Sequence, residues 1–304
     1  MFKKIVKGFK NPKTVISIIW QACSRLIISD KLYLKVYYYL HTGEKLHLNN
    51  PVTFNEKTQW LKLHNTSSLC TQMADKYGVR ELVKQTIGEQ YLIPIYGVWD
   101  KFEEIDFEEL PNQFVLKTTH DSGSVVICKD KNKLDIKQAK KKLKKSLSHN
   151  YFWNGREYPY KNIKPRIIAE KYMSNDDGKD ISDYKFFCFN GEPEILFYAS
   201  DRFNKDGERT KFDYYNMNLE HLPIQSRGHK NSNTPIPYFE QFSEMKGLAA
   251  KLSAGFPFLR VDLYLINNKV YFGELTFHHD GGVVPFIPSE WNKILGDKIK
   301  LGLS

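Results

Sequence analysis

Cysteine is scarce in this chain of 304 residues, and no long apolar run is present. The four cysteines, at positions 23, 70, 128 and 188, stand singly, so no pair has the spacing of a zinc or redox motif. A reducing cytoplasm is therefore the compartment we expect. Cys128 and Cys188 lie in apolar, strand-like runs, and their thiols are expected to be buried and unreactive.

The apolar segment nearest the start, residues 15–28, is interrupted by Gln21, Ser24 and Arg25. It is too short and too polar to span a bilayer, which takes about 20 apolar residues. No small-residue cleavage site follows a clean apolar core, so a signal peptide is not predicted. We expect a helix packed on the body of the protein. A basic amphipathic helix resting on an anionic membrane surface is the alternative.

Acidic residues are in deficit, because 35 Asp and Glu stand against 45 Lys and Arg and the net charge is +10. Such an excess predicts an anionic partner. No nucleic-acid recognition motif accompanies it, so we expect no nucleic acid, while phosphorylated substrates and anionic phospholipid remain. The lysine run at residues 140–145 lies in a segment with apolar residues on one helical face. We interpret this run as a solvated helix face.

A β-hairpin is predicted near the end of the chain, where apolar residues 261–266 and a turn at residues 267–269 precede a returning strand. Each strand carries one acid among apolar neighbours, Asp262 and Glu274. A buried carboxylate is costly unless a cation pairs with it. With Arg260 on the same face as Asp262, the two acids predict a divalent-metal site beside an arginine. Two unrelated acids facing solvent are the alternative.

Other strands enclose a loop of small residues. Residues 114–117 and 125–128 are predicted strands, and the loop between them has backbone N–H groups that can converge on an anion above Lys117. The lysine spacing of a Walker loop is absent. Residues 166–173 are a further strand, and Asn190-Gly191 marks the turn of a second hairpin.

The remaining segments give the predicted domain organisation. Residues 30–41 and 243–252 are expected to be helical, residues 91–94 extended, and residues 200–240 a long substrate-facing loop region. A helix capped by Thr53 or Asn55 is predicted, and another opens at residues 75–80. Together these predict a mainly helical region (1–74), a linker (75–111), a first lobe (112–173) and a second lobe (174–304).

The order of these motifs resembles the ATP-grasp superfamily, specifically its teichuronopeptide-biosynthesis (TupA-like) branch, over residues 30–300. The resemblance is carried by Pro51-Val-Thr-Phe-Asn-Glu-Lys57 with Trp60, Asp75-Lys76, Leu110-Pro-x-x-Phe-Val-Leu-Lys117 with His120 and Ser122-Gly123, Ile168-Ala-Glu170-Lys-Tyr172, Asp183-Tyr-Lys185, Arg260-Val-Asp262 and Gly273-Glu274-Leu-Thr276-Phe277. It implies an α+β ATP-grasp fold, in which two α+β lobes clamp ATP after a mainly helical N-terminal region.

The resemblance also implies ATP and Mg²⁺ as cofactors and assigns roles residue by residue. The implied ATP-binding residues are Lys76, Lys117, the flap residues Ser122, Gly123 and Ser124, the adenine-reading segment Glu170, Lys171, Tyr172 and Met173, and Lys185. The implied catalytic residues are Arg260, Lys185 and Lys117, and the implied metal ligands are Asp262, Glu274 and Thr276. A plain helix-start lysine is the alternative for Lys76, and a strand-edge lysine for Lys185.

Thr276 departs from the family pattern, which often has asparagine there, so a second Mg²⁺ would be held more weakly or through water. His278, His279 and Asp280 follow directly. A zinc site built from them is one reading. A substrate-facing role for His278, His279 and Gly281, or a place for the histidines in the core, is the reading we prefer.

The family further implies an ATP-dependent carboxylate–amine ligase of cell-surface polysaccharide assembly, which forms an acyl phosphate and then an amide. The expected partners are an acidic or lipid-linked glycan and a small amine, in the cytoplasm or at the inner face of the membrane. A glycosyltransferase is the alternative, with Asp176, Asp177 and Asp180 as its nearest metal-binding acids. A non-catalytic nucleotide-binding protein is a third hypothesis.

Overall fold

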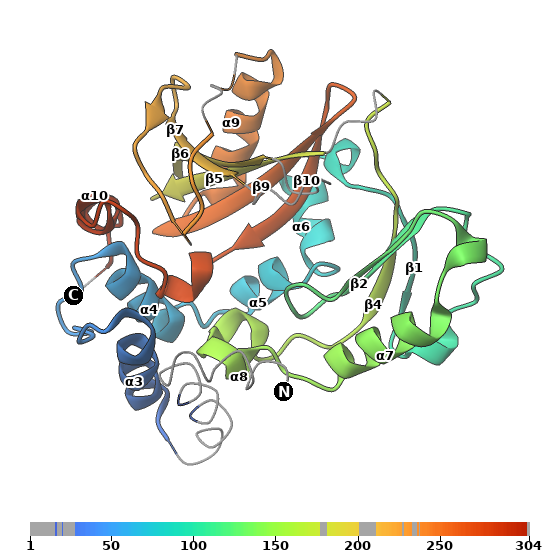
Figure 1. Cartoon of the computed structure of the whole chain (residues 1–304), viewed down its shortest axis with the longest axis horizontal. Coiled ribbons are helices and arrows are strands. Elements are labelled where there is room, and N and C mark those ends of the chain that lie inside the picture. The colour runs from blue at the N-terminus through green and yellow to red at the C-terminus, as the bar shows by residue number, and fades with distance from the viewer. Residues whose placement is uncertain are drawn as a thin grey trace.

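Two antiparallel sheets organise the chain (Figure 1). The computed structural model describes residues 28–176, 181–200, 211–226, 228–232, 236 and 238–302, together with Ile16 and Trp20. The predicted N-terminal helix and the acids Asp177 and Asp180 lie outside these residues. The helices are α3 (Asp30–Thr42), α4 (Phe54–His64), α5 (Ser68–Ala74), α6 (Val79–Thr86), α7 (Ile136–Leu147), α8 (Phe152–Gly155), α9 (Gln241–Ser253) and α10 (Glu290–Lys298), with 3-10 turns η1 (Glu89–Tyr91), η2 (Phe102–Glu104), η3 (Lys131–Lys133), η4 (Tyr158–Tyr160) and η5 (His279–Gly282).

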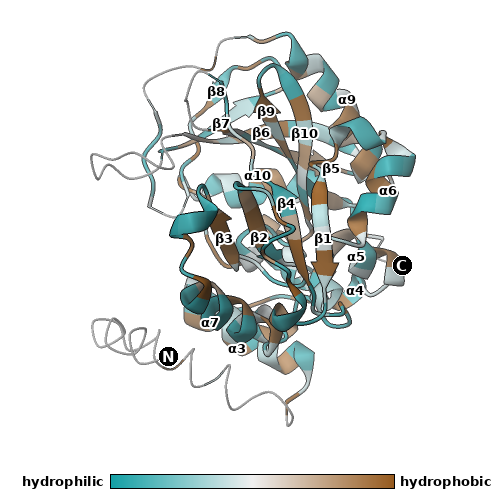
Figure 2. Ribbon diagram, turned by 90° about the vertical axis from the view of Figure 1, so that its right-hand side faces the viewer, coloured by the Kyte–Doolittle hydropathy of each residue, from teal (hydrophilic) through white to brown (hydrophobic). Residues whose placement is uncertain are grey.

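The first sheet has four strands in the order β1-β4-β2-β3. These strands are β1 (Ile95–Trp99), β2 (Phe114–Thr118), β3 (Val125–Cys128) and β4 (Ile167–Lys171). Helix α7 packs on one face through Ala139 and Leu143, which join the core of this lobe. Figure 2 shows the same sheet with α7 beneath it.

Strand β1 was not predicted. It lies in the segment expected to be a linker, residues 75–111, and it pairs with β4, where Trp99 faces Ile167. The extended segment predicted for residues 91–94 is found in part: Tyr91 ends the 3-10 turn η1, whereas Leu92 is extended, and strand β1 begins at Ile95.

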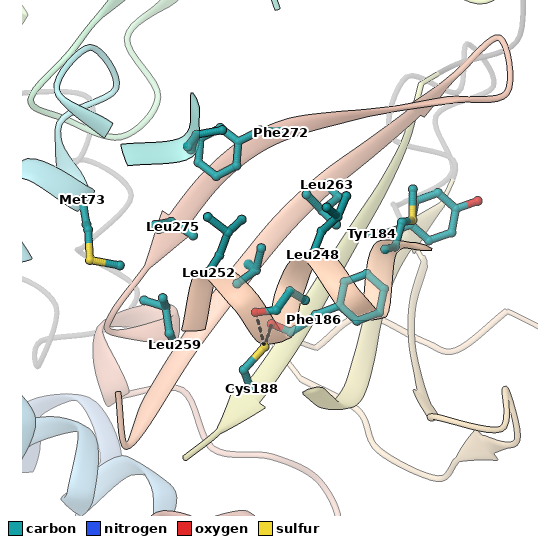
Figure 3. Packing of buried hydrophobic residues seen from close by; sticks show 14 of the residues in the cluster. Met73, Tyr184, Phe186, Cys188, Leu248, Leu252, Leu259, Leu263, Phe272 and Leu275 are labelled. Atoms are coloured by element: carbon teal, nitrogen blue, oxygen red, sulfur yellow. Dashed lines mark hydrogen bonds between the residues drawn. The ribbon is translucent and has the colours of Figure 1, made fainter. Parts of the chain in front are cut away.

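The second sheet has six strands in the order β10-β9-β5-β6-β7-β8. These are β5 (Ser182–Phe189), β6 (Glu192–Ser200), β7 (Lys211–Asn216), β8 (His221–Leu222), β9 (Phe258–Ile266) and β10 (Lys269–Thr276). Helices α5, α6 and α9 cover one face, and Figure 3 shows α9 packing Leu248 and Leu252 against it. Burial in this core raises the pKa of the Cys188 thiol to about 12, so this cysteine is unreactive as expected.

Strands β7 and β8 correct the prediction of a continuous loop over residues 200–240. Strand β7 pairs with β6, and Tyr214 and Tyr215 are both buried, one on each face of the sheet. These aromatic rings stabilise the core, so they are not the exposed wall of a substrate loop. Residues 201–210 lie outside the described part.

The helical region before the lobes is part of the second lobe's core. Thr53 caps α4 as predicted, in a capping box with Glu56 that satisfies N-terminal backbone groups of the helix. Phe54, at the start of α4, packs edge-on against Phe258 at a ring distance of 4.9 Å and against Phe286 at 5.5 Å. Helices α4 and α10 therefore close the face of the sheet opposite α9.

Both predicted hairpins form. Asn267 and Asn268 adopt positive φ angles of 49° and 60°, and Asn190 and Gly191 adopt 53° and 89°, which are the conformations that two-residue hairpin turns require. The α+β architecture with two antiparallel sheets and preceding helices agrees with the expected fold class. No helix of the described residues is long and apolar enough to cross a membrane.

Candidate active site

A cleft of about 360 Å³ lies between the two sheets. Both lobes contribute side chains, as does the segment around α6, so the cleft exists only when the sheets face each other. Its lining comprises Lys76, Arg80, Leu92, Ile93, Lys117, Ser122, Gly123, Val125, Ile127, Glu170, Tyr264, Phe272, Gly273 and Glu274.

One part of the cleft is strongly cationic. Lys117, on β2, reaches Glu170 of the neighbouring strand β4, with 2.5 Å between Nζ and Oε2. Lys76 donates from Nζ to the backbone carbonyl of Asp121. Burial lowers the pKa of Lys76, against the opposing effect of Glu274 and Asp121. Lys76 is thus not a plain surface lysine. Arg80 also lines the cleft, so three cations meet the carboxylates of Glu170 and Glu274 there.

Arg80 was not singled out from the sequence. It lies in the first turn of α6, near Glu170, and burial lowers its pKa while Glu170 opposes that effect. The pattern that could have found it is the spacing from Lys76 to Arg80. The two residues are four apart at the start of α6: Lys76 precedes the helix, and Arg80 is its second residue.

The rest of the cleft is apolar. Leu92 and Ile93 come from the segment before β1, Ile127 from β3, and Tyr264 and Phe272 from the second sheet. These side chains surround a space that suits a flat, mostly apolar ring with polar edges. Such walls and a cationic end together match the two halves of a nucleotide.

Of the four predicted adenine-reading residues, one lines the cleft and three do not. Glu170 lines the cleft, whereas Lys171, Tyr172 and Met173 are not among its lining residues. The backbone N–H of Lys171 donates to the carbonyl of Pro94 at 2.9 Å, and Lys129 lies over the Tyr172 ring at 5.7 Å. The role of these three residues remains a prediction.

The loop between β2 and β3 is held by Asp121. This buried carboxylate accepts hydrogen bonds from Thr118 Oγ1 at 2.5 Å, from Ser146 Oγ at 2.6 Å and from the hydroxyl of Ser124. Burial alone would raise the pKa of Asp121, but the hydroxyls of Ser124, Ser146 and Thr118 outweigh it and lower the pKa. Gly123 has a φ of 93°, a conformation that favours glycine. Thr118 also bonds Ser146 of α7, so the loop is tied to that helix.

Asp121 was missed at the sequence level, although a signal was present. A single acid lies in a loop of threonine, serine and glycine, with hydroxyl residues three positions before it and three after it. Ser124, predicted to close over phosphates, points its hydroxyl at Asp121. Ser122 and Gly123 are exposed and line the cleft.

Across the cleft, the second sheet carries a buried ion cluster. Arg260 donates two hydrogen bonds to Asp262, from Nε to Oδ1 at 2.7 Å and from Nη2 to Oδ2 at 2.8 Å. Its Nη2 also donates to Glu274 Oε1 at 2.9 Å. Lys185, on β5, donates to Asp262 and lies 2.6 Å from Asp183. Since β5 runs between β9 and β6, Lys185 is not a strand-edge lysine.

Sheet register explains why these residues meet. Asp262 on β9 is the Cα partner both of Lys185 on β5 and of Glu274 on β10. Burial would raise the pKa of Asp262, but the charges of Arg260 and Lys185 outweigh this effect and lower it. The carboxylate is therefore ionised and fully engaged, with its side chain 1% exposed.

The two predicted metal acids differ in access. Both oxygens of Asp262 accept from Arg260 or Lys185, whereas the Glu274 side chain is 43% exposed and lines the cleft. Thr276 Oγ1 donates to Glu274 Oε1 at 3.2 Å. Mg²⁺ is commonly held by one or two carboxylates plus substrate phosphates, so Glu274 fits such a site once phosphates are present. Within the described ranges no group of three or more His, Cys, Asp or Glu residues could hold a metal ion by itself.

His279 supports Arg260. The two side chains meet at 3.0 Å between Nη1 and Nδ1, and because a guanidinium can only donate, His279 Nδ1 is the acceptor. The imidazole is 2% exposed and lies 4.7 Å from the Phe187 ring centroid. Its place in the core agrees with one of the two readings that we preferred, and the zinc reading has no ligand set in the described structure.

His278 and Gly281 face the helical region. His278 Nδ1 lies 3.2 Å from Glu157 Oε2, and the carbonyl of Gly281 accepts from Lys62 Nζ at 2.8 Å and from Gln59 Nε2 at 2.9 Å. These contacts seat the turn η5 on α4. A role of His278, His279 or Gly281 toward substrate remains a prediction.

Two buried charges near η5 were missed. Burial lowers the pKa of Lys62 to about 8, partly offset by Glu157. Burial would raise the pKa of Glu157, but His278 and Lys62 reverse this and lower it. Nothing in the sequence marked them, since Lys62 reads as a helix-surface lysine and Glu157 lies in a segment without periodicity. Tyr160, nearby, lines a narrow crevice with Lys76 and Glu274.

Comparison with known proteins gave one family and several distant structures. A family described as TupA-like ATP-grasp matches residues 56–300. No curated protein matches the chain.

Solved structures similar to the chain include three ligases or synthetases. D-alanine–D-alanine ligase from Helicobacter pylori shares 13% identity over 75% of this chain and 63% of that one, with a TM-score of 0.38. The ATP-grasp ligase PsnB, complexed with minimal precursor, Mg and ADP, shares 10% over 77% of this chain and 60% of that one, with a TM-score of 0.41. The D-cycloserine synthetase DcsG shares 14% over 76% and 72%, with a TM-score of 0.39. The chain spans less than two thirds of the length of the first two.

Proposed function

Because the chain belongs to the TupA-like ATP-grasp family, we propose that it is an ATP-dependent ligase that joins a carboxylate to an amine. The observation that carries the proposal is the cleft between the two sheets. It combines an apolar end, a cluster of the cations Lys76, Arg80 and Lys117, and the accessible carboxylate of Glu274.

The cleft fits ATP in one orientation. The ring of adenine would lie between the apolar side chains Ile93, Ile127 and Phe272, and the phosphates would extend toward Lys117 and Lys76. Lysine ammonium groups act as mobile point charges that suit phosphate oxygens. The pairing of Lys117 with Glu170 keeps its ammonium group at the cleft wall.

Mg²⁺ would be held by Glu274 together with phosphate oxygens, and Asp262 would join only if Arg260 or Lys185 turned away from it. When bound, the ion would neutralise phosphate charge. Thr276 orients Glu274 through its hydroxyl, so this residue supports the carboxylate from the side.

ATP supplies a γ-phosphoryl group, which a substrate carboxylate oxygen attacks to give an acyl phosphate and ADP; an amine then attacks the acyl carbon, and phosphate and a proton leave. In this chain Arg260 supplies positive charge next to Glu274, and Lys185 supplies it next to Asp262 on the neighbouring strand. Positioning and electrostatic stabilisation provide most of the catalysis in phosphoryl transfer. Asp262 and His279 fix the guanidinium of Arg260 for that task.

For the substrates, we propose the carboxylate of an acidic or lipid-linked surface glycan and a small amine. The family association supports this choice, and so does the net charge of +10, which favours an anionic partner. We propose a cytoplasmic location, with peripheral contact at the inner face of the membrane when the glycan is carried on lipid.

The proposal is tested first by ligand-induced stabilisation. Thermal unfolding is measured with Mg–ATP, with Mg–UDP-glucose and with Mg–GDP-mannose. A ligand that binds only the folded state raises the unfolding temperature, so we expect an increase with Mg–ATP alone. Lys117→Met should remove the increase, and Lys251→Met, at an exposed lysine of α9 outside the cleft, should retain it. Stabilisation by a nucleotide sugar and not by ATP would favour a glycosyltransferase and overturn the ligase proposal.

The chemistry is tested by trapping the acyl phosphate. Hydroxylamine is added with Mg–ATP and a panel of glucuronate, galacturonate and their oligomers, and hydroxamate and ADP are counted. Equal amounts of the two products, both dependent on the carboxylate, are expected. Arg260→Gln should abolish hydroxamate formation. Because it also removes a partner of the buried Asp262, the variant is compared with itself, and its unfolding temperature should still rise when Mg–ATP is added. ADP release at the same rate with and without each carboxylate of the panel would contradict the mechanism.

A further inference from the structure

Helix α7 carries an unusual density of positive charge on the first lobe. Its 12 residues include six lysines and no acid, and most of the helix has the teal colour of hydrophilic residues in Figure 2. Ala139 and Leu143 face the core. The lysines therefore occupy most of the solvent-facing arc, which they share with Ile136 and Gln138.

The six lysines divide into two groups. Lys140 and Lys144 both pair with Glu103, at 2.9 and 3.0 Å, and Lys142 donates to the carbonyl of Val125 at 2.6 Å. The other three are Lys137, Lys141 and Lys145, which we call the α7 lysine stripe. All three are exposed, and no acidic side chain in the described part of the chain pairs with them.

The stripe costs the isolated helix stability. Its members follow one another at intervals of four residues, about 6 Å along the axis, and like charges at this spacing repel. Lys137 also lies in the first turn, where a positive charge opposes the helix dipole. An anionic ligand that bridges the three ammonium groups would relieve this repulsion.

We propose that the α7 lysine stripe binds a linear acidic glycan and holds the polymer beside the cleft. An interfacial membrane helix would need a row of apolar residues facing the lipid, but Ala139 and Leu143 are buried against the sheet and Ile136 is the one large apolar side chain that α7 exposes. A nucleic-acid surface would offer aromatic rings for stacking or arginines for base edges, and the exposed arc has neither. Hydrated ammonium groups alone suit a chain of carboxylates recognised by charge spacing.

Helix α7, which carries the stripe, also contacts the cleft and the loop between β2 and β3. Lys142 contacts Val125, which lines the cleft, and Ser146 bonds Asp121 of the loop between β2 and β3. A polymer on the stripe would thus run along the lobe that carries the phosphate-binding loop. This tethering role rests on the proposed ligase function, whereas binding itself does not.

Binding is measured by fluorescence anisotropy with a labelled oligogalacturonate, without nucleotide. The test variant is Lys137→Gln/Lys141→Gln/Lys145→Gln. The matched control is Lys251→Gln/Lys269→Gln/Lys300→Gln, which removes the same net charge from exposed lysines elsewhere. We expect the test variant to bind about tenfold more weakly at low salt, as three lost surface ion pairs imply, with a shallower dependence on salt. The control should change less than about twofold, and the unfolding temperature should not fall in either variant.

Three results would overturn the inference. One is equal weakening in the two triple variants, which would mean a response to net charge alone. Another is unchanged glycan binding in the stripe variant while binding to phosphatidylserine vesicles is lost, which would assign the stripe to a membrane. The third is unchanged glycan binding with loss of an oligothymidylate, which would assign it to nucleic acid.

The tethering role is then tested by kinetics on the substrate that the hydroxamate assay identifies. We expect the stripe variant to raise KM for the polymer and to leave kcat, and KM for the monomer, unchanged. An equal change for polymer and monomer would contradict tethering. Failure of the ligase assay with glycan binding intact would refute the proposed function and leave the binding surface standing.

Discussion

Replacing Asp262 by asparagine should damage folding, while replacing Glu274 by glutamine should not. Asp262 is 1% exposed and accepts three hydrogen bonds from Arg260 and Lys185. Asparagine keeps the shape but presents amide hydrogens to two cations and removes the central negative charge. Breaking a buried ion pair on one side typically costs about 3 to 5 kcal/mol. The glutamate side chain, 43% exposed, forms one ion pair with Arg260, and such a pair contributes under about 1 kcal/mol.

Urea unfolding measures the contrast. With a slope of about 3 kcal/mol per molar, Asp262→Asn should move the midpoint down by about 1 M, and Glu274→Gln by less than about 0.3 M. The stabilisation that Mg–ATP adds should instead fall more in Glu274→Gln than in Asp262→Asn, because Glu274 is the acid that lines the cleft. Equal destabilisation by both variants, or none by Asp262→Asn, would refute the division of labour between the two acids.

The pH dependence supplies a second check. Since the pKa of Asp262 is lowered in the folded state, its contribution is present above the ordinary carboxyl range and is lost as pH falls through the lower folded value. The stability difference between the wild type and Asp262→Asn should therefore be constant near neutrality and shrink below about pH 4. A difference that grows in acid would contradict the assigned charge state.

Three further predictions concern stability and are measured by urea unfolding. Thr53→Ala removes the cap of α4 and should cost about 1 kcal/mol, whereas Thr66→Ala, at an exposed site, should be neutral. Gly282→Ala should cost more than about 2 kcal/mol, because φ is +61° and the added Cβ would lie 2.6 Å from neighbouring atoms; Gly247→Ala, in open space on α9, should instead stabilise by about 0.5 to 1 kcal/mol. Burial holds the pKa of Lys62 near 8, so the folded state resists its protonation, and the stability of the wild type relative to Lys62→Met should rise between about pH 8 and pH 10. A flat profile would mean that Lys62 is solvated.

Local patterns predicted the elements whose hydrogen bonds are local. The β9–β10 hairpin was found because apolar residues bracket Asn267 and Asn268, and the same reasoning found the turn at Asn190. Strand β1 was missed since it is short, contains Gly97 and pairs with a bulge to β4, which lies about 70 residues later. Strand β7 was missed because Asp213 looks like a loop residue.

In the structure Asp213 is buried and satisfied by distant groups. His221 contacts it at 3.0 Å, and the backbone N–H of Ser232 donates to it at 2.9 Å. Burial raises its pKa, and these partners oppose that effect. A polar residue can occupy a core strand when its partners arrive from elsewhere in the chain, and no short sequence window contains that information.

The same limit applies to the candidate site. Period two placed Arg260 beside Asp262 correctly, and the two acids do face each other across β9 and β10. That Lys185 reaches the same carboxylate depends on the pairing of β5 with β9, which the sequence does not specify. For this reason Asp262 was expected to be an open metal ligand, and its engagement by two cations was not foreseen.

Phe54 packs among Phe187, Phe258 and Phe286, and this packing limits which segments can be exchanged between this protein and its relatives. The helical region and the second lobe share one packed interface, so neither is an interchangeable module. A chimera that exchanges only the region before α5 would import a foreign ring into a pocket shaped by three others. Paired changes at these positions are what divergent members of the family should display, and a library that swaps the helical region should keep folded only those clones that carry the matching rings.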